Sequence, residues 1–332
     1  MSVDAVPHRS DPPASAGHGA LAPHRIIVGA DAHAGIIAAL RARRADFEFR
    51  GGMHTEVTAD DLAWGDTYIG FRRPPGATTM GNVRWVHCTG AGVDSWLSPV
   101  ELDRAILLTR TPESFGPAIA EWVVARVLAV QQQLLSLAAA QHAHRWAPRD
   151  IALVTGTRAL VVGTGDIGSA VAMKLGSLGV EVTGVSRTGH GDHRVFRAVH
   201  PVETLSERVA DADWIVLTVP ATPGTRGLFS REVMACCRGA VLLNAGRGSV
   251  VDEAALLEAL DNGCLRGAAF DVFATEPLPA TSPLWTHPRM MVSPHCSGRT
   301  TVEGAVGGFL ECLELLERGE TPRWVVDRDR GY

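Results

Sequence analysis

What this sequence lacks already narrows its class. No apolar run reaches the roughly 18 residues that a membrane-spanning helix needs. Acidic residues outnumber basic ones, 36 against 31, and the net charge is −5, so the chain has no strongly basic character that would favour nucleic acid. The sequence therefore predicts a protein that binds neither a membrane nor nucleic acid.

The cysteines also lack a functional pattern. There are six of them but no C-x-x-C pair, and the adjacent Cys236 and Cys237 suit a metal ion poorly. Scattered free thiols are typical of a reducing compartment, so we expect a cytoplasmic protein without a metal site. Cys296 follows a candidate catalytic histidine and can line its pocket, but the chemistry does not need it as a nucleophile.

Residues 1–23 are rich in Pro, Ala, Ser and His and have no apolar core like that of a signal peptide, so we expect a disordered leader. From Arg25 onward, short β-rich runs alternate with helical patterns, which is typical of parallel β-α-β units. The first series has a helix at about 34–44 and strands at 25–29, 47–50, 67–71, 84–87 and 105–109.

One long amphipathic helix is predicted over about 117–142, between two series of strands, because its apolar residues recur near the helical period. In the second series, the helix over 251–263 has Asp252 to cap its start and Gly263 to end it, and a last helix follows at about 300–317. The expected strands of this series are 158–163, 180–185, 214–219, 240–245, 267–273 and 290–294.

A glycine-rich string follows the strand at 158–163 and opens a helix. It contains Gly163, Gly165, Asp166, Ile167 and Gly168 in a G-x-G-x-x-G pattern. In this context the pattern predicts a dinucleotide site: the first glycine makes a tight turn, the second lets the backbone approach the pyrophosphate, and the third lets helix and strand pack closely. The helix start offers free N–H groups to the phosphates.

The next strand ends in Ser186, Arg187 and Thr188, where NAD sites usually carry an acid for the ribose 2′-hydroxyl. Arg187 and the two hydroxyls can instead hold a 2′-phosphate, so we favour NADP(H) over NAD(H). The alternative is that Arg187 is only solvated and that both cofactors are accepted.

Three polar residues follow strands of the second series. They are Arg247, Glu276 and His295, and ligands of open α/β sheets bind at the carboxyl ends of strands. Arg247 has the planar fork that grips a carboxylate, His295 can exchange a proton with a ketone oxygen, and Glu276 can raise the pKa of His295 by stabilising imidazolium. The trio predicts hydride-transfer chemistry on a 2-oxo or 2-hydroxy acid.

Several segments together resemble the D-isomer-specific 2-hydroxyacid dehydrogenase family, strongly over about residues 85–300. They are GTGDIGSAVA (163–172), WIVLTVPATPGTRGLF (214–229), LLNAGRGSVVDEAALLEAL (242–260), GAAFDVFATEPLPATSPLW (267–285) and VSPHCSG (292–298). The Ser-Arg-Thr signal resembles the glyoxylate/hydroxypyruvate reductase branch. Glu276 argues against the formate-oxidising branch, which has Gln in that role.

The resemblance implies an α/β fold with two Rossmann-like or flavodoxin-like domains, doubly wound parallel sheets, and an active-site cleft between them. A substrate domain would span 24–117, completed by a C-terminal helical segment at 298–332, and a dinucleotide-binding domain would span 118–297, with Thr111-Pro112-Glu113 in the link. The substrate carboxylate would meet Arg247 and the loop residues Gly90, Ala91 and Gly92. Asp94 follows that loop, or caps a helix. Further cofactor contacts are expected at Pro220, Thr222, Ala245 and Asp271.

Three questions stay open at this point. The first is whether Asp271 helps to set the pH dependence of the reaction or is a structural carboxylate at the end of its strand. The resemblance implies a homodimer, because family members usually form one. Trp146 then packs against the partner, where it can also reach the partner's active site, or it packs within its own chain. The substrate is a small 2-oxo acid or a bulkier one such as phenylpyruvate. Candidate pocket residues are Met53, His54, Phe71, Arg72, Arg73 and Trp285, although the two arginines also suit a solvated loop.

Two other functions compete with 2-oxo acid reduction to a D-2-hydroxy acid. One is a non-catalytic NAD(P)-sensing protein of the same fold, since some such proteins keep the same trio. The other is oxidation of an inorganic anion such as phosphite.

Overall fold

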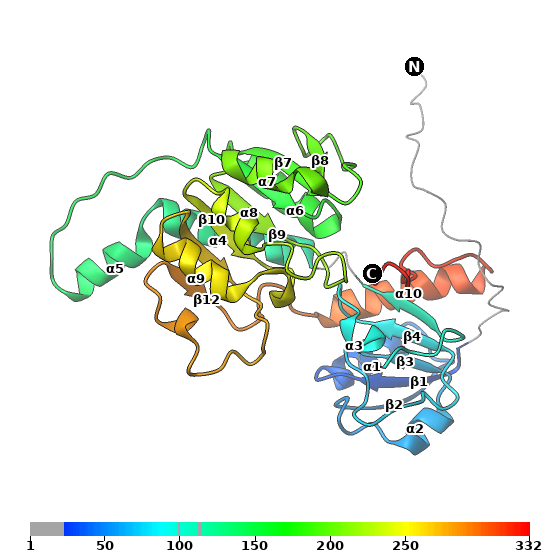
Figure 1. Ribbon diagram of the computed structural model, residues 1–332. Coiled ribbons are helices and arrows are strands. Elements are labelled where there is room, and N and C mark those ends of the chain that lie inside the picture. The colour runs from blue at the N-terminus through cyan, green and yellow to red at the C-terminus, as the bar shows by residue number, and fades with distance from the viewer. Residues whose placement is uncertain (1–22, 99, 112–114) are drawn as a thin grey trace.

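The structure is a computed structural model that describes residues 23–98, 100–111 and 115–332 (Figure 1). The leader predicted over 1–23 lies outside these residues except for Pro23, and so do Pro112 and Glu113 of the predicted link. Figure 1 shows two α/β bodies, one formed by the first strands together with α10 and one formed by the strands that follow α4. The α/β class and the two-domain architecture are as predicted.

The first sheet is parallel and has the order β2-β1-β3-β4-β5, which is the flavodoxin-like order. All five expected strands are present, some with shifted ends. The strands are β1 (Arg25–Gly29), β2 (Glu48–Gly52), β3 (Thr67–Ile69), β4 (Trp85–Cys88) and β5 (Leu107–Arg110), and the helices are α1 (His33–Arg41), α2 (Ala59–Trp64) and α3 (Asp94–Leu97).

The second sheet is also parallel, with the order β12-β11-β10-β9-β6-β7-β8. This is the Rossmann order extended by one strand. Short β8, which ends in a proline at the sheet edge where proline is tolerated, has no counterpart among the expected strands. The strands are β6 (Arg158–Val162), β7 (Glu181–Ser186), β8 (Val199–Pro201), β9 (Trp214–Leu217), β10 (Ala240–Asn244), β11 (Leu265–Phe270) and β12 (Met290–Val292).

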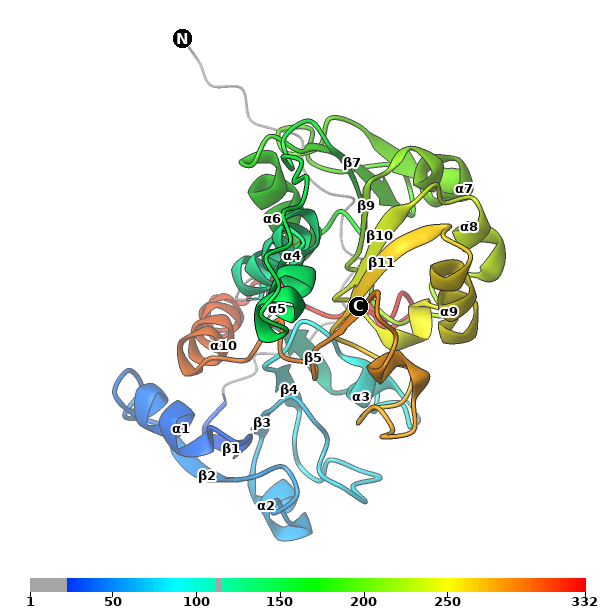
Figure 2. The same ribbon diagram turned by 90° about the vertical axis from the view of Figure 1, so that its left-hand side faces the viewer.

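Helices cover both faces of the second sheet. Figure 2 shows α4 and α6 on one side and α7, α8 and α9 on the other, which is the doubly wound arrangement. These helices are α6 (Asp166–Gly176), α7 (Leu205–Arg208), α8 (Arg231–Ala235) and α9 (Glu253–Asp261). The predicted cap of α9 is confirmed: Asp252 Oδ1 accepts hydrogen bonds from the amides of Ala254 and Ala255, and Gly263 beyond its end has a φ of +84°.

The prediction of a single helix over 117–142 is wrong. Two helices, α4 (Gly116–Gln131) and α5 (Leu134–His142), meet at a bend of 59° where Gln133 is left-handed. The reason lies in packing: α4 buries Ile119, Trp122, Val123 and Val127 in the core, whereas α5 buries only Ala140, so no core contact keeps the second half in line with the first.

Within the described residues no single helix is long and apolar enough to cross a membrane, although this bent pair passes that test by length and composition.

Helix α5 and the segment that follows it project away from the second domain (Figure 1). We call residues 134–153 the arm. Its large apolar side chains are exposed: Trp146 is 95% exposed, Leu153 75% and Leu135 58%. The alternative in which Trp146 packs within its own chain is therefore wrong.

The end of the chain returns to the first domain. Helix α10 (Val302–Glu317) packs on α1 and the first sheet, and Phe309 stacks on Trp85 with ring centroids 4.7 Å apart. Beyond α10, Val325 forms an antiparallel bridge with Thr109 of β5. The first domain is thus assembled from both ends of the chain.

Candidate active site

The predicted catalytic trio follows three strands that are neighbours in the second sheet. Arg247 follows β10, Glu276 follows β11 and His295 follows β12. Because all strands are parallel, their carboxyl ends meet at one edge of the sheet. The structure therefore brings together residues from three separate segments.

His295 and Glu276 form a direct pair. The Nδ1 atom of His295 lies 2.7 Å from Oε2 of Glu276, and Oε1 of Glu276 accepts a hydrogen bond from the Phe273 amide at 3.0 Å. The hydrogen bond with Glu276 raises the pKa of His295, although partial burial opposes this shift. Partial burial opposes ionisation of Glu276 too, but the bonds from His295 and Phe273 lower its pKa. The pair thus favours imidazolium beside carboxylate.

Asp271 holds the loop that carries His295. This carboxylate is fully buried and accepts hydrogen bonds from Ser293 Oγ at 2.5 Å and from the amides of Cys296 and Ser297 at 3.0 and 2.8 Å. Burial raises the pKa of Asp271, but these bonds outweigh it and the net shift is downward. His295 itself has a φ of +50°, a left-handed backbone that is uncommon for a non-glycine residue.

These contacts give Asp271 the structural role that was one of its two alternatives. It holds the loop that carries His295, whose amide donates to the Asp271 carbonyl at 2.8 Å. The charge of Asp271 also helps to raise the pKa of His295, so a role in the pH dependence stays a prediction. A cofactor contact by Asp271 stays a prediction.

Replacing Glu276 with glutamine tests the pair. In the reduction direction His295 must be protonated, so activity is full below its pKa and is lost as the pH rises through it. Glutamine removes the charge that raises this pKa, so we expect the loss of kcat/KM to begin at lower pH than in the wild type. The measurement is a pH profile of 2-oxo acid reduction.

Glu253 provides the matched control for this variant. Its Oε1 accepts a hydrogen bond from the Ala274 amide at 2.7 Å, so it supports the loop that carries Glu276 while His295 pairs with Glu276 alone. The Glu253→Gln profile should keep the wild-type basic limb. The pairing role would be rejected if the basic limb of the Glu276→Gln pH profile stayed at its wild-type position, or if it moved by the same amount in both variants.

Arg247 faces the first domain. Its Nε and Nη2 atoms each lie 2.8 Å from Oδ2 of Asp94, and its Nη1 donates to the Gly246 carbonyl at 2.7 Å. A guanidinium has five N–H donors, so these contacts leave one on each of Nη1 and Nη2. Asp94 makes no helix-cap bond at the start of α3, so the cap reading is wrong and Asp94 pairs with Arg247 instead.

The predicted substrate loop lies against Arg247. A Cβ atom on Gly92 would sit 1.4 Å from Arg247 Nη2, and one on Gly90 would sit 2.4 Å from the Phe71 ring. A side chain at position 92 would therefore displace the end of Arg247, and one at position 90 would displace the Phe71 ring. Ala91 between them accepts a hydrogen bond from Arg110 Nη1 at 2.7 Å. The charge of Arg247 also helps to lower the pKa of Glu276 and partly opposes the upward shift of the His295 pKa.

The glycine-rich string has the geometry of a dinucleotide cradle. Gly163 has a φ of +103°, and a Cβ on Gly168 would lie 1.8 Å from the Gly163 carbonyl oxygen. A Cβ on Gly165 would meet no heavy atom within 4 Å, so there is open space where a pyrophosphate would approach. Exposed Asp166 and half-buried Ile167 start α6, and the first N–H groups of a helix have no partner within the helix. These residues fit a nicotinamide dinucleotide.

The other predicted cofactor residues surround the cradle at neighbouring strand ends. Arg187 and Thr188 are exposed after β7, and Ser186 Oγ donates to the His190 carbonyl at 2.9 Å. After β9, Thr222 and Pro220 belong to a loop closed by Thr225 Oγ1, which donates to the Pro220 carbonyl and accepts from the Thr222 amide. Ala245 is buried directly after β10.

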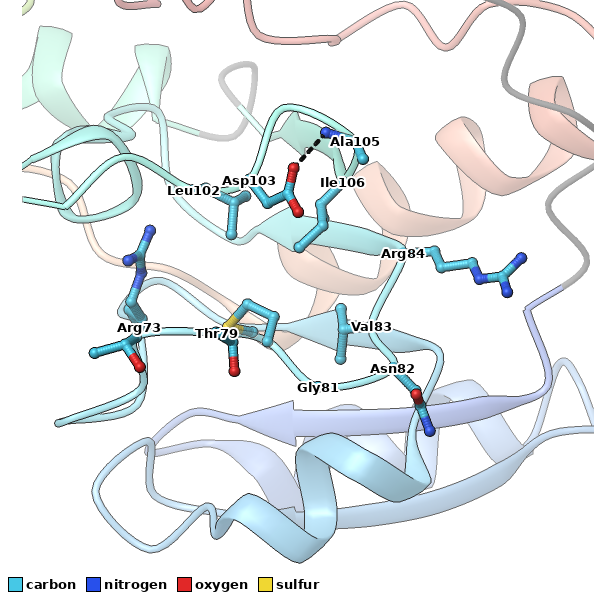
Figure 3. A pocket seen from close by; sticks show the side chains of 12 residues that line it. Arg73, Thr79, Gly81, Asn82, Val83, Arg84, Leu102, Asp103, Ala105 and Ile106 are labelled. Atoms are coloured by element: carbon cyan, nitrogen blue, oxygen red, sulfur yellow. Dashed lines mark hydrogen bonds between the residues drawn. The ribbon is translucent and has the colours of Figure 1, made fainter.

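A cavity of about 450 Å³ lies elsewhere in the first domain (Figure 3). Figure 3 shows Val83 and Ile106 between Arg73 at one end and Arg84 at the other. Arg84 and Ile106 precede β4 and β5, so the cavity is at the amino ends of these strands, away from the trio. Arg73 stacks over Trp96 and donates to its carbonyl at 3.0 Å, which gives it a packing role rather than a place in the substrate pocket.

Comparison with known proteins agrees with this geometry. The family model described as D-isomer specific 2-hydroxyacid dehydrogenase, NAD binding domain, matches residues 124–297. The uncharacterized protein in mprR 3'region of Streptomyces coelicolor is 35% identical over 260 residues, 78% of this chain and 93% of that protein. Glyoxylate/hydroxypyruvate reductase A of Serratia proteamaculans is 31% identical over 272 residues, 78% of this chain and 86% of that protein.

A solved structure is similar over nearly the whole chain. It is a D-isomer specific 2-hydroxyacid dehydrogenase from Xanthobacter autotrophicus Py2 in complex with NADPH and MES, with a TM-score of 0.85 and 30% identity, and the match covers 94% of this chain and 100% of that one. The fold and the site thus define a two-domain, dinucleotide-dependent oxidoreductase. The chain belongs to the D-isomer specific 2-hydroxyacid dehydrogenase family, and the resemblance to its glyoxylate/hydroxypyruvate reductase branch is confirmed.

Two residues near the site were undervalued or missed by sequence reasoning. Asp94 was placed beyond the substrate loop without a partner, because its contact with Arg247 joins residues 153 positions apart. Arg110 was overlooked, although it stands at the end of a buried strand like the trio. The strand-end rule that identified Arg247 could have identified it too.

Proposed function

We propose that this protein reduces a small 2-oxo acid, of the glyoxylate or hydroxypyruvate type, to a D-2-hydroxy acid with Arg247, Glu276 and His295 as its working residues. The observation that carries the proposal is the 2.7 Å contact between His295 Nδ1 and Glu276 Oε2 at the strand ends that also hold Arg247. The relatives named glyoxylate/hydroxypyruvate reductase A support this substrate class.

Each residue then has one task. Arg247 holds the substrate carboxylate with its remaining N–H groups, and the backbone at Gly90, Ala91 and Gly92 lies beside it. A bound nicotinamide supplies the hydride that the substrate carbon receives. His295 gives the ketone oxygen its proton from Nε2, because Nδ1 is held by Glu276. The imidazole is left neutral, and the reverse direction returns the proton to it.

We further propose NADP(H) as the preferred cofactor, with contacts at Gly163, Gly165, Asp166, Ile167 and Gly168. Arg187 stands after β7 where an acid would select NAD, and a similar solved structure holds NADPH. The remaining proposed contacts are Ser186, Thr188, Pro220, Thr222, Ala245 and Asp271.

A substrate panel tests the function. Loss of NADPH absorbance is followed with glyoxylate, hydroxypyruvate, pyruvate and phenylpyruvate, and gain of absorbance is followed with NADP⁺ and phosphite or formate. We expect turnover with the small 2-oxo acids. Best turnover with phenylpyruvate would overturn the substrate size, turnover only with phosphite would overturn the reaction, and tight cofactor binding without any turnover would indicate a sensing protein.

We propose a homodimer in which the arm carries the interface. Its exposed apolar side chains, above all Trp146 at 95%, form the kind of surface that a monomer rarely leaves uncovered. We place Trp146 against the partner subunit. A measured solution mass of only 35.3 kDa, the mass of one chain, would reject the dimer.

Domain limits and location are proposals as well. We propose a substrate domain at 24–117 completed by 298–332 and a dinucleotide domain at 118–297, supported by the packing of α10 on the first sheet. We propose a cytoplasmic location from the scattered cysteine pattern, which cell fractionation would test.

A further inference from the structure

The last residues of the chain form a compact loop fixed to the first domain. We call residues 327–332 the C-terminal loop. It follows Val326, whose amide donates to the Leu108 carbonyl of β5 at 2.9 Å. Inside the loop, Arg328 Nη1 donates to the carbonyls of Leu102 and Asp103 at 2.6 and 2.9 Å. The base of the loop is therefore anchored on two sides.

The loop is also closed by its own hydrogen bonds. The Asp327 amide donates to the Tyr332 carbonyl at 3.1 Å, and the Gly331 amide donates back to the Asp327 carbonyl at 2.8 Å. Asp327 Oδ1 accepts from the amides of Asp329 and Arg330 at 3.1 and 3.0 Å. With a φ of +82°, Gly331 makes the turn that brings Tyr332 back to Asp327. The backbone that carries the Tyr332 ring is thus held by these contacts.

From this base the loop crosses to the other domain. The Tyr332 ring centroid lies 6.0 Å from Cζ of Arg187, and a Cβ on Gly331 would lie 3.4 Å from Cγ2 of Thr222. In both views the end of the chain lies at the border between the two bodies (Figures 1 and 2). The C-terminal loop therefore lies close to two proposed cofactor residues that follow different strands.

The contact with Arg187 has a clear physical use. A free arginine loses rotamer entropy when it binds a phosphate, and a side chain already held in place loses less. An aromatic ring attracts the face of a guanidinium and leaves its N–H edge available for hydrogen bonds. Exposed Arg187 has the ring of Tyr332 as such a neighbour.

We propose that Tyr332 is a positioning residue for cofactor choice: its ring holds Arg187 ready for the 2′-phosphate of NADP(H). The inference rests on the proposed role of Arg187. Tyr332 acts through Arg187 and not on the substrate, so it affects the affinity for the phosphorylated cofactor and leaves the affinity for NAD(H) unchanged. Because the loop belongs to the first domain, the second domain receives part of its cofactor selectivity from outside itself.

The test compares Tyr332→Leu, which removes the ring, with Tyr332→Phe, which keeps it. Dissociation constants of NADPH and NADH are measured by nicotinamide fluorescence, and those of 2′,5′-ADP and 5′-AMP by calorimetry, so no turnover is required. We expect Tyr332→Leu to weaken NADPH and 2′,5′-ADP about threefold to tenfold, with NADH and 5′-AMP unchanged. Tyr332→Phe should stay within about twofold of the wild type.

Arg187→Leu separates the inference from the proposed function. If Arg187→Leu leaves the ratio of the NADPH and NADH constants at its wild-type value, the proposed phosphate role of Arg187 fails and the inference fails with it. If Arg187→Leu abolishes the preference but Tyr332→Leu keeps it, only the inference is overturned. In the double variant, the loss of the ring should have no further effect on NADPH. Equal weakening of NADPH and NADH by Tyr332→Leu would also overturn the proposal, because it would indicate general loss of structure.

Discussion

Replacing His295 with alanine should reduce kcat for 2-oxo acid reduction by roughly 10²- to 10⁴-fold, the range by which a positioned acid accelerates proton transfer. The variant lacks the proton donor for the ketone oxygen, and Glu276 loses its partner at 2.7 Å. Cofactor affinity should stay near the wild-type value, because the proposed dinucleotide contacts lie at the ends of other strands. NADPH oxidation at substrate saturation measures kcat, and fluorescence titration measures cofactor binding.

The control for this variant is His193→Ala, in which an exposed histidine of the second domain is removed. It should keep wild-type kcat. If His295→Ala retains more than a tenth of the wild-type kcat, His295 is not the acid. If cofactor binding falls together with kcat, the loop has collapsed and the role of proton donor loses its support.

Replacing Arg247 with lysine should lower kcat/KM for the 2-oxo acid by about 10- to 100-fold, the equivalent of one charged hydrogen bond. Lysine keeps the positive charge but loses the planar fork that pairs with Asp94 on one side and leaves N–H groups for the substrate on the other. Because the charge persists, the basic limb of the pH profile set by His295 should stay in place. The readouts are KM, kcat and the pH profile.

Two further variants sharpen this result. Arg43→Lys changes an exposed arginine just beyond α1, outside the arm, and should leave all three readouts unchanged. Asp94→Asn keeps the shape of the Arg247 partner but removes its charge, so we expect a smaller increase in KM than with Arg247→Lys. A wild-type KM in Arg247→Lys would contradict the carboxylate clamp.

The parts of the site that sequence reasoning found are local. The cradle from Gly163 to Gly168 lies within a few residues of one strand and one helix start, so its pattern is visible in the chain itself. The trio was found because each member follows its own strand, and parallel strands place their ends at one edge. The break at Gln133 was missed because the apolar period continues through it, and only the loss of core contacts beyond Val127 reveals it.

The sequence by itself determined the class of fold, the cradle for the dinucleotide, and the three residues at the strand ends, because hydrophobic period and turn chemistry act over short stretches of chain. Only the tertiary structure decided what surrounds them. It paired Arg247 with Asp94 of the other domain, placed Gly92 against the Arg247 guanidinium, and brought Tyr332 to Arg187. Such contacts join residues far apart in the chain, and their geometry depends on how the two domains pack rather than on any local pattern.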